Sequence, residues 1–404
     1  MSEQEILDIN ELLKASSAYK ASDLHIKVGN PPVLRVDGHL HPMPDKRRVT
    51  QEDVMKIGYS VMNDAQKEKF KRSSEIDIAY SVPGLGRFRV NVFQQRGTIG
   101  LVFRLIPVKI MTLDELDLPP VLGSMSLKPR GLILVTGTTG SGKSTTLAAM
   151  LHHINQNLTA HIITVEDPIE YLHRDVKSIV NQREVGSDTL SFGAALKSAL
   201  RQDPDIIMVG EMRDFETIET ALVAAETGHL VMSTVHTVDA TETINRIISV
   251  FPPYQQKQIR LQLAGVLQGI ISMRLVPISQ GKGRAPAVEV LVATNRVKEC
   301  IIDKDRTHEL ADVIASGYTQ YGMQSFDQAL MMLFKKKLIT YEEALRQSTR
   351  PDDFALKVKG IDGTADAWTE LEKMQADTSG EGESAAQTET QPEGDGEELK
   401  LDRF

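Results

Sequence analysis

Residues 137–144 read Gly-Thr-Thr-Gly-Ser-Gly-Lys-Ser, and they follow the apolar run Gly-Leu-Ile-Leu-Val-Thr at 131–136. The pattern G-x-x-x-x-G-K-[ST] between a buried strand and a helix is typical of a phosphate-binding loop. Its glycines let backbone N–H groups curl around a phosphate, and the helix N-terminus adds partial positive charge. The alternative is a glycine-rich turn without a ligand, which would not need that strand and helix. The predicted nucleotide-binding residues are Gly137, Thr138, Thr139, Gly140, Ser141, Gly142, Lys143, Ser144 and Thr145.

The sequence around this loop alternates short apolar runs with helical stretches. The apolar runs lie at 131–136, 161–165, 205–209 and 229–235. Runs that are apolar on both faces are typical of parallel strands covered by helices on each side of a sheet. The helices expected between them span 144–157, 192–201 and 217–227. This pattern predicts a mostly parallel α/β core of the nucleotide-binding type.

The residues before this core predict a smaller α/β unit. We expect a helix at 6–15, a hairpin turning at Asp37-Gly38, a helical region at 51–71 and antiparallel strands at 76–82, 88–93 and 100–106. Prolines at positions 107, 119 and 120 interrupt regular structure and predict a connecting segment.

The residues after the core are predicted to be mainly helical. Helices are expected at 241–250, 254–273, 325–336 and 340–346, interrupted by one strand at 287–293. The predicted organisation is therefore an N-terminal domain at 1–110, a linker at 111–120, the main domain with its helical end at 121–360 and a tail at 361–404.

The net charge of −9 is concentrated near the C-terminus, where residues 377–404 hold nine acidic and two basic side chains. Most of this tail lacks aromatic and β-branched aliphatic residues, so it cannot offset the entropy of ordering and is predicted to be disordered. A solubilising tail is one interpretation, and a tethered interaction motif is the other. The remaining chain is nearly neutral, which leaves a local basic groove possible.

Composition also restricts the cofactors and the compartment. Cys300 is the only cysteine, so the chain can form no internal disulfide and no four-cysteine zinc site, and a reducing compartment fits it. The N-terminus lacks the features of a signal peptide, and no stretch approaches ~20 uninterrupted apolar residues. We therefore expect a cytoplasmic protein without zinc and without a membrane span.

Nucleotide hydrolysis needs an acid that orients water or supports the metal, in addition to the phosphate loop. Glu166, Glu211 and His236 each follow a predicted parallel strand, and the carboxyl ends of such strands open onto one crevice. Lys143 should reach the β- and γ-phosphates of ATP, and the Ser144 hydroxyl should ligate Mg²⁺. Capping of the next helix is the alternative role for either glutamate.

With these residues in place, the chain closely resembles the secretion ATPases of type II secretion systems and type IV pili. The resemblance rests on a Walker A segment, an aspartate-box-like segment, a Walker B-like segment, a histidine-box-like segment and two N-terminal motifs. The Walker A segment lies at 137–144, the aspartate-box-like segment at 163–170, the Walker B-like segment at 203–214 and the histidine-box-like segment at 227–237. The two N-terminal motifs lie at 21–26 and 86–91. The resemblance implies a PAS-like N-terminal α/β domain followed by a RecA-like P-loop NTPase domain.

The resemblance also implies a homohexameric ring that hydrolyses Mg²⁺-bound ATP, with arginines of the N-terminal domain reaching the phosphates. Arg87, Arg89 and Arg104 are the candidates, although exposed sheet-surface arginines would show the same alternation. Glu211 is expected to polarise the attacking water and Glu166 to support the Mg²⁺ ion or the water. The choice of general base between them stays open. His229 would relate the nucleotide state to subunit contacts.

Within this family the chain is most similar to the pilus retraction motors, because it lacks the tetracysteine insertion and the longer N-terminal region of extension motors. The resemblance implies an inner-membrane platform protein as partner, pilin as indirect target and a peripheral position at the cytoplasmic face of the inner membrane. A motif typical of retraction motors is only partly kept at 296–303, which leaves an accessory or regulatory pilus ATPase as an alternative.

A RecA-like nucleic-acid translocase could use the same core, but it should show a basic stripe or an aromatic stacking platform. The basic runs at 69–72 and 335–337 are more typical of solvated helix faces, and the chain has a single tryptophan. We therefore expect no nucleic-acid partner.

Overall fold

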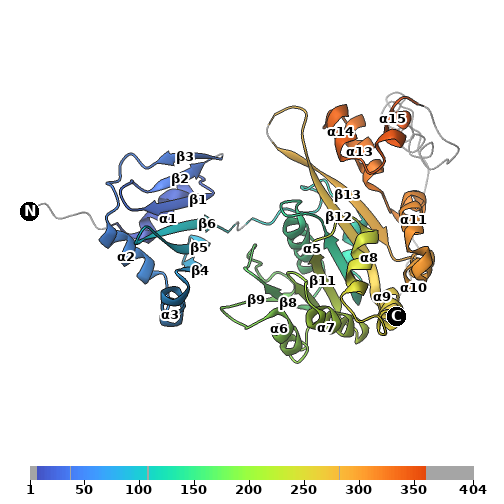
Figure 1. Ribbon diagram of the computed structural model, residues 1–404, viewed down its shortest axis with the longest axis horizontal. Helices are drawn as coiled ribbons and strands as arrows, with labels where there is room; N and C mark the ends of the chain where they lie inside the picture. Colours follow the sequence, from blue (N-terminus) through green and yellow to red (C-terminus); the bar gives the residue numbers. More distant parts are fainter. Residues whose placement is uncertain (1–6, 37, 107–108, 282, 361–404) are drawn as a thin grey trace, which may run out of the picture. The chain divides into compact units, whose positions relative to one another are not determined.

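The computed structural model describes residues 7–36, 38–106, 109–281 and 283–360, which form two sheets (Figure 1). The first has six strands in the order β3-β2-β1-β6-β5-β4, and the second has seven in the order β13-β12-β7-β11-β10-β8-β9. The predicted acidic tail and the turn residue Asp37 lie outside the described residues. The domain limits drawn from the sequence stay predictions.

The six-stranded sheet is antiparallel throughout and carries three helices. Its elements are α1 (Ile9–Ala18), β1 (Asp23–Lys27), β2 (Val33–Val36), β3 (His39–Pro42), α2 (Gln51–Ser60), α3 (Asp64–Ser73), β4 (Glu75–Val82), β5 (Gly86–Gln95) and β6 (Thr98–Leu105). The predicted hairpin and antiparallel strands are confirmed. The sequence analysis missed β1, a central strand whose buried Leu24 and Ile26 alternate with the polar Asp23 and His25.

The seven-stranded sheet is parallel from β12 to β9, and β13 joins its edge antiparallel. Its strands are β7 (Gly131–Thr136), β8 (His161–Glu166), β9 (Ile179–Glu184), β10 (Ile206–Val209), β11 (Leu230–Val235), β12 (Leu267–Pro277) and β13 (Arg284–Val292). Every residue of β7, β10 and β11 is buried, as expected for strands covered on both faces. The predicted parallel core is confirmed.

Helices cover both faces of this sheet. On one face, buried residues of α4 (Val121–Ser126) and α5 (Lys143–Asn157) pack into one apolar cluster. On the other, buried residues of α6 (Phe192–Ala199), α7 (Phe215–Glu226), α8 (Ala240–Ser249), α9 (Gln256–Val266), α10 (Asn295–Ile302) and α11 (Leu310–Ser316) form a second cluster. The chain continues through η1 (Lys304–Glu309), α12 (Tyr318–Tyr321), α13 (Phe326–Lys335), α14 (Tyr341–Gln347) and α15 (Pro351–Val358).

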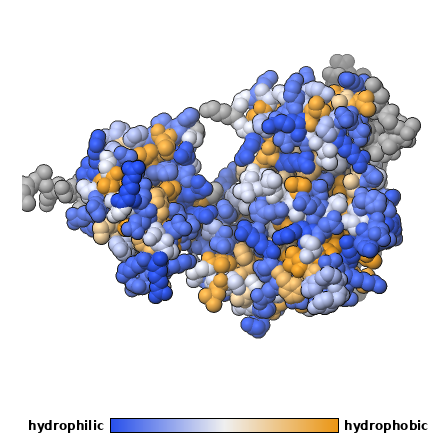
Figure 2. Space-filling view, in the orientation of Figure 1, coloured by the Kyte–Doolittle hydropathy of each residue, from blue (hydrophilic) through white to orange (hydrophobic). Residues whose placement is uncertain are grey.

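The surface of both sheet-containing parts is mostly hydrophilic on the face that Figure 2 shows, with smaller separate apolar areas. Within the described ranges, none of the helices is both long and apolar enough to cross a lipid bilayer.

The predicted helix at 254–273 is wrong in its second half. Helix α9 ends at Val266, and β12 begins at Leu267, where it pairs in parallel with Leu132 of β7. The run is apolar at helical and at strand spacing, so periodicity alone could not distinguish the two. The β-branched Ile270 and Ile271 are fully buried in the sheet, where such side chains pack well.

Two glycines test this boundary. An alanine Cβ at Gly265 would enter open space on α9, so Gly265→Ala should stabilise the fold by up to about 1 kcal/mol. A Cβ at Gly269 would lie 2.7 Å from the carbonyl oxygen of Leu291, so Gly269→Ala should destabilise it by roughly 1–3 kcal/mol. Urea unfolding followed by circular dichroism measures both. Stabilisation by both substitutions would mean that the helix continues past Val266.

Candidate nucleotide-binding site

The loop at 137–142 connects the end of β7 to the start of α5. Gly137 has φ +142°, and a Cβ there would lie 2.6 Å from the carbonyl oxygen of Met273, so glycine is required. Lys143 begins α5, and its Nζ donates hydrogen bonds to the carbonyl oxygens of Gly137 (2.8 Å) and Thr138 (2.9 Å). Burial lowers the pKa of Lys143, while the negative charge of Glu211 acts in the opposite direction.

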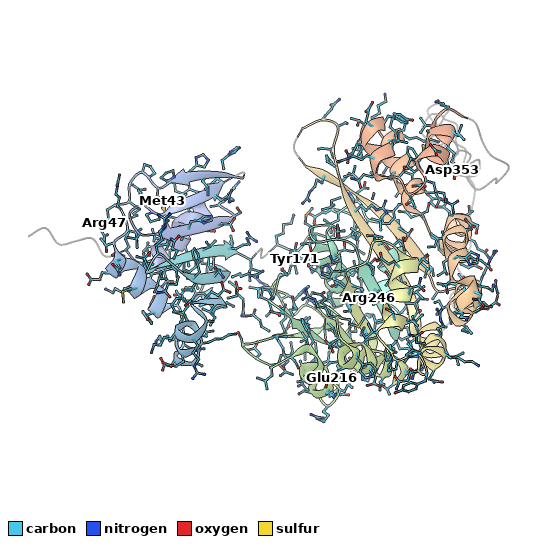
Figure 3. All side chains as sticks on the ribbon, in the orientation of Figure 1. Met43, Arg47, Tyr171, Glu216, Arg246 and Asp353 are labelled. Atoms are coloured by element: carbon cyan, nitrogen blue, oxygen red, sulfur yellow. The ribbon has the colours of Figure 1, made fainter. Side chains whose placement is uncertain are left out.

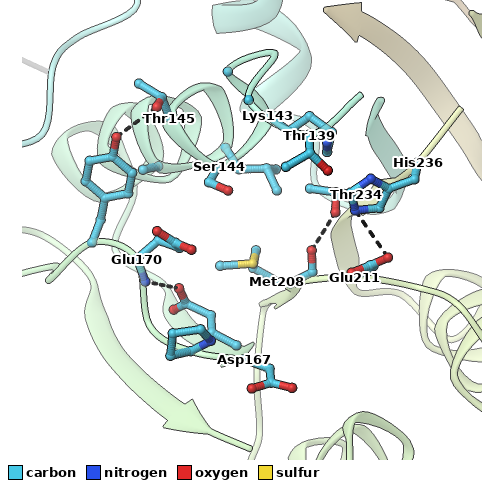
Figure 4. A pocket seen from close by; sticks show the side chains of 18 of the residues that line it. Thr139, Lys143, Ser144, Thr145, Asp167, Glu170, Met208, Glu211, Thr234 and His236 are labelled. Atoms are coloured by element: carbon cyan, nitrogen blue, oxygen red, sulfur yellow. Dashed lines mark hydrogen bonds and ion pairs between the residues drawn. The ribbon is translucent and has the colours of Figure 1, made fainter. Parts of the chain in front are cut away.

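A cavity of about 540 Å³ opens over this loop (Figure 4). It is lined by the predicted loop residues Thr139, Gly140, Gly142, Lys143, Ser144 and Thr145. Glu166, the last residue of β8, lines the same cavity, as do Glu211 and His236, which follow β10 and β11. The structure therefore brings together the strand-end residues that the sequence placed at one crevice. The predicted loop residues Gly137, Thr138 and Ser141 are not among the lining residues.

Glu211 lies between two groups that carry or can acquire positive charge. Its Oε1 forms an ion pair with Nε of Arg213 and lies 3.3 Å from Nε2 of His236. The hydrogen bond and charge of Glu211 raise the pKa of Arg213, so that guanidinium stays charged. The carboxylate of Glu211 is thus an oriented acceptor at the wall of the cavity. Arg213 was missed by the sequence analysis, although it lies in the quoted Walker B-like segment.

Glu166 has a different environment, because its carboxylate is buried and held by three donors. The hydroxyl of Thr164 (2.7 Å) and the amide of Gln182 (3.0 Å) donate to its Oε1, and the backbone N–H of Glu170 donates to Oε2 (3.2 Å). Burial raises its pKa, and these hydrogen bonds act in the opposite direction. The two glutamates therefore differ: Glu166 is fixed in the wall, whereas Glu211 is paired with the more exposed side chains of Arg213 and His236.

Three further pocket residues escaped the sequence analysis. The hydroxyl of Tyr171, in the segment after β8 (Figure 3), lies 2.8 Å from the hydroxyl of Thr145. His173 is neutral, because burial lowers its pKa to about 4. Arg284, at the start of β13, donates from Nη1 to the carbonyl oxygen of Gly140 at 3.3 Å. Proximity to the quoted 163–170 segment could have indicated Tyr171, but nothing in the sequence links Arg284 to the loop.

The candidate arginines do not line the cavity, and each has an acidic partner. Arg87 donates to Glu184 (3.1 Å), Arg104 donates to Asp23 (2.8 Å), and Arg89 lies 3.7 Å from Asp77. Their predicted contact with phosphates stays a prediction.

His229 lies outside the cavity as well. It immediately precedes β11, at the end of that strand opposite to His236, and its Nδ1 lies 2.9 Å from the carbonyl oxygen of Ala224 in α7. Its predicted role in subunit contacts also stays a prediction.

A parallel sheet, a glycine-rich loop before a helix and acidic residues at neighbouring strand ends define a RecA-like P-loop nucleotide-binding domain. A family model described as type II/IV secretion system protein matches residues 3–346. The chain belongs to this family, and the predicted secretion ATPase relationship is confirmed.

Known proteins of the family match the chain over most of its length. The type IV pilus retraction ATPase PilT of Pseudomonas aeruginosa is 46% identical over 353 residues, which is 86% of this chain and 100% of PilT. The type IV pilus ATPase PilU of the same organism is 42% identical over 366 residues, 90% of this chain and 95% of PilU. The crystal structure of the pilus retraction motor PilT with bound ADP superposes with a TM-score of 0.79 and 48% identity, covering 86% of this chain and 98% of that chain.

Removing the ammonium of Lys143 should weaken nucleotide binding. Hydrogen bonds to charged groups contribute about 1.5–3 kcal/mol each, so Lys143→Ala should lower ADP affinity by roughly 10- to 100-fold or more. Titration with a fluorescent ADP analogue measures the affinity, and Lys128→Ala, an exposed lysine outside the cavity, is the matched control. Unchanged affinity in a folded Lys143→Ala protein would exclude this loop as the phosphate site.

Proposed function

We propose that this chain is an ATP-hydrolysing motor that powers type IV pilus retraction and thereby twitching motility. The observation that carries the proposal is the convergence of Lys143, Glu166 and Glu211 on one cavity, in a chain that matches PilT over that protein's full length. The chain is an ATPase of the secretion family, and the ADP in the PilT crystal structure supports the assignment of the cavity to an adenine nucleotide.

The donor set of the cavity fits a Mg²⁺ ion that is bound together with ATP. Ser144 offers a hydroxyl and Glu166 a carboxylate, and the described residues contain no cluster of three or more His, Cys, Asp or Glu side chains that could hold a metal alone. This suits Mg²⁺, which usually takes one or two protein ligands and completes its shell with phosphates and water. When bound, the ion neutralises charge on the phosphate oxygens.

Different residues of the chain then have separate roles in hydrolysis. Lys143 binds the β- and γ-phosphates, and Glu211, oriented by Arg213 and His236, accepts a hydrogen bond from the attacking water. Glu166 supports the metal or the water from within the wall of the cavity. Arginines of the N-terminal part, Arg87, Arg89 and Arg104, complete the site when the two parts close, and hydrolysis lets them reopen.

The motor acts as a homohexamer in this proposal, so that six such closures transmit force around a ring. It lies at the cytoplasmic face of the inner membrane, bound to an integral platform protein, and acts on pilin indirectly. Nucleic acid is not a partner. The support for this arrangement is family membership and similarity to two type IV pilus ATPases.

An accessory or regulatory pilus ATPase is the second candidate, favoured by the sequence at 296–303. These residues lie mostly in α10, where Val297, Cys300 and Ile301 are buried and keep the apolar packing of the helix. The exposed positions of this segment include Arg296 and Glu299. The similarity to PilU, another type IV pilus ATPase, is consistent with this candidate.

Glu211→Gln tests the water-orienting role. It removes the negative charge but keeps the shape of the side chain, so turnover should fall by ~10² or more while ADP affinity stays within a few-fold of wild type. Phosphate release gives the rate, and Glu219→Gln, an exposed glutamate on α7, is the matched control. A near-normal rate would overturn the assignment of Glu211.

Deletion with complementation tests the direction of work. In the organism that encodes this chain, a retraction motor predicts that deletion causes excess pili and abolishes twitching, and that the wild-type gene restores both whereas a Lys143→Ala gene restores neither. Pili counted by electron microscopy and colony-edge twitching are the measurements. Loss of all pili would indicate extension instead, and normal twitching would favour the accessory role.

A further inference from the structure

Three polar side chains form a row across the core of the seven-stranded sheet. The register pairs Ser272 of β12 with Thr136 of β7 on one side and with Glu289 of β13 on the other. The hydroxyl of Thr136 donates to Ser272 Oγ at 3.1 Å, and the hydroxyl of Ser272 donates to Glu289 Oε1 at 3.2 Å. Thr136 and Ser272 are fully buried, and only 8% of Glu289 is exposed.

The two ends of this row contact segments that lead to residues of the nucleotide site. Thr136 is the last residue of β7 and directly precedes Gly137 of the phosphate loop. At the other end, Glu289 Oε1 accepts the backbone N–H of Ala240, the first residue of α8, at 2.9 Å. A carboxylate at a helix N-terminus is stabilised by the partial positive charge of the first amides.

Helix α8 begins at Ala240, a short segment after His236, which contacts Glu211. The segment from His236 to Asp239 connects β11 to α8, and Nε2 of His236 lies 3.3 Å from Glu211 Oε1. A second contact fixes this segment, because the hydroxyl oxygens of Thr237 and Thr243 lie 2.6 Å apart. The position of the first turn of α8 therefore constrains the position of His236.

Packing alone does not explain the carboxylate of Glu289 in the core of the sheet. A buried acid is penalised by desolvation, and an apolar side chain of similar volume often stabilises a core at least as well. Burial raises the pKa of Glu289 to about 7; the negative charge of Asp239 acts in the same direction, while Arg274 opposes it. Glu289 is unfavourable for packing, so its hydrogen bonds to Ser272 and to the backbone of Ala240 explain its presence better.

We propose that Glu289 is a positioning residue for ATP hydrolysis: through Ser272 and Thr136 it fixes the strand that carries the phosphate loop, and through Ala240 it fixes the segment that places His236 beside Glu211. The proposal rests on the hydrolytic function proposed above. If Glu289 is a positioning residue, it affects the turnover step more than nucleotide binding. The reason is that Glu289 contacts Ser272 and Ala240, which hold segments of the site, and does not line the cavity.

Steady-state kinetics on the full-length chain tests this. Glu289→Ala should lower kcat about tenfold or more while KM for ATP and ADP affinity change less than about threefold. Glu289→Gln should restore kcat to within about threefold of wild type, because the amide oxygen can accept both hydrogen bonds. Ser272→Ala removes the hydrogen bonds to Thr136 and to Glu289 but keeps the bond between Glu289 and Ala240, so it should lower kcat by a smaller factor. Glu342→Ala, an exposed glutamate on α14, is the control.

Several outcomes would overturn the proposal. One is a folded Glu289→Ala protein with kcat within twofold of wild type, and another is an equal loss of kcat and ADP affinity that Glu289→Gln does not restore. If Glu289→Ala does not fold, a wild-type kcat in both Ser272→Ala and Thr136→Val would reject it. A wild-type chain that releases no phosphate would instead contradict the proposed function, so the two failures are distinguishable.

Discussion

The site depends on a buried lysine at the start of α5. Lys143 is only 8% exposed, and burial alone would favour its neutral form. The carbonyl oxygens of Gly137 and Thr138 accept its hydrogen bonds, and the charge of Glu211 supports the ammonium form. This geometry requires a glycine at 137, since a side chain there would collide with the carbonyl of Met273. An ammonium already desolvated among backbone acceptors is well prepared for a phosphate, because each charge-assisted hydrogen bond gains strength away from water.

The parallel sheet brings two glutamates of the same chemistry to one cavity, where their environments differ. Both lie where a parallel strand ends and line the same cavity. Glu166 accepts three hydrogen bonds inside the wall, whereas Glu211 pairs with Arg213 and His236. A rigid, buried carboxylate suits a fixed position beside a metal or a water. A carboxylate whose partners are the more exposed Arg213 and His236 suits a step in which charge moves, because such partners can be released as the phosphate charge develops.

Much of this site follows from sequence, since continuous apolar runs identify parallel strands and the topology then brings their ends together. That logic placed Glu166, Glu211 and His236 correctly at one cavity. It could not find Arg284, because the contact of Arg284 with Gly140 depends on how the β12–β13 hairpin lies beside the loop. It also failed at β1, where polar residues alternate with Leu24 and Ile26, and at β12, where apolar residues fit a helix and a strand equally well.

The error at β12 explains why the buried polar row was invisible in the sequence. A helix through 254–273 would place Ser272 on a helical surface, away from Thr136, and would leave Glu289 as an isolated acid in an apolar strand. Only the register of β7, β12 and β13 aligns the three side chains and directs the last of them at the first amide of α8. Packed strands shift as units rather than deform continuously. A hydrogen-bonded row across three strands therefore links the strand that carries the phosphate loop to the start of α8, which gives a nucleotide-driven motor a direct connection from its phosphate site to a helix.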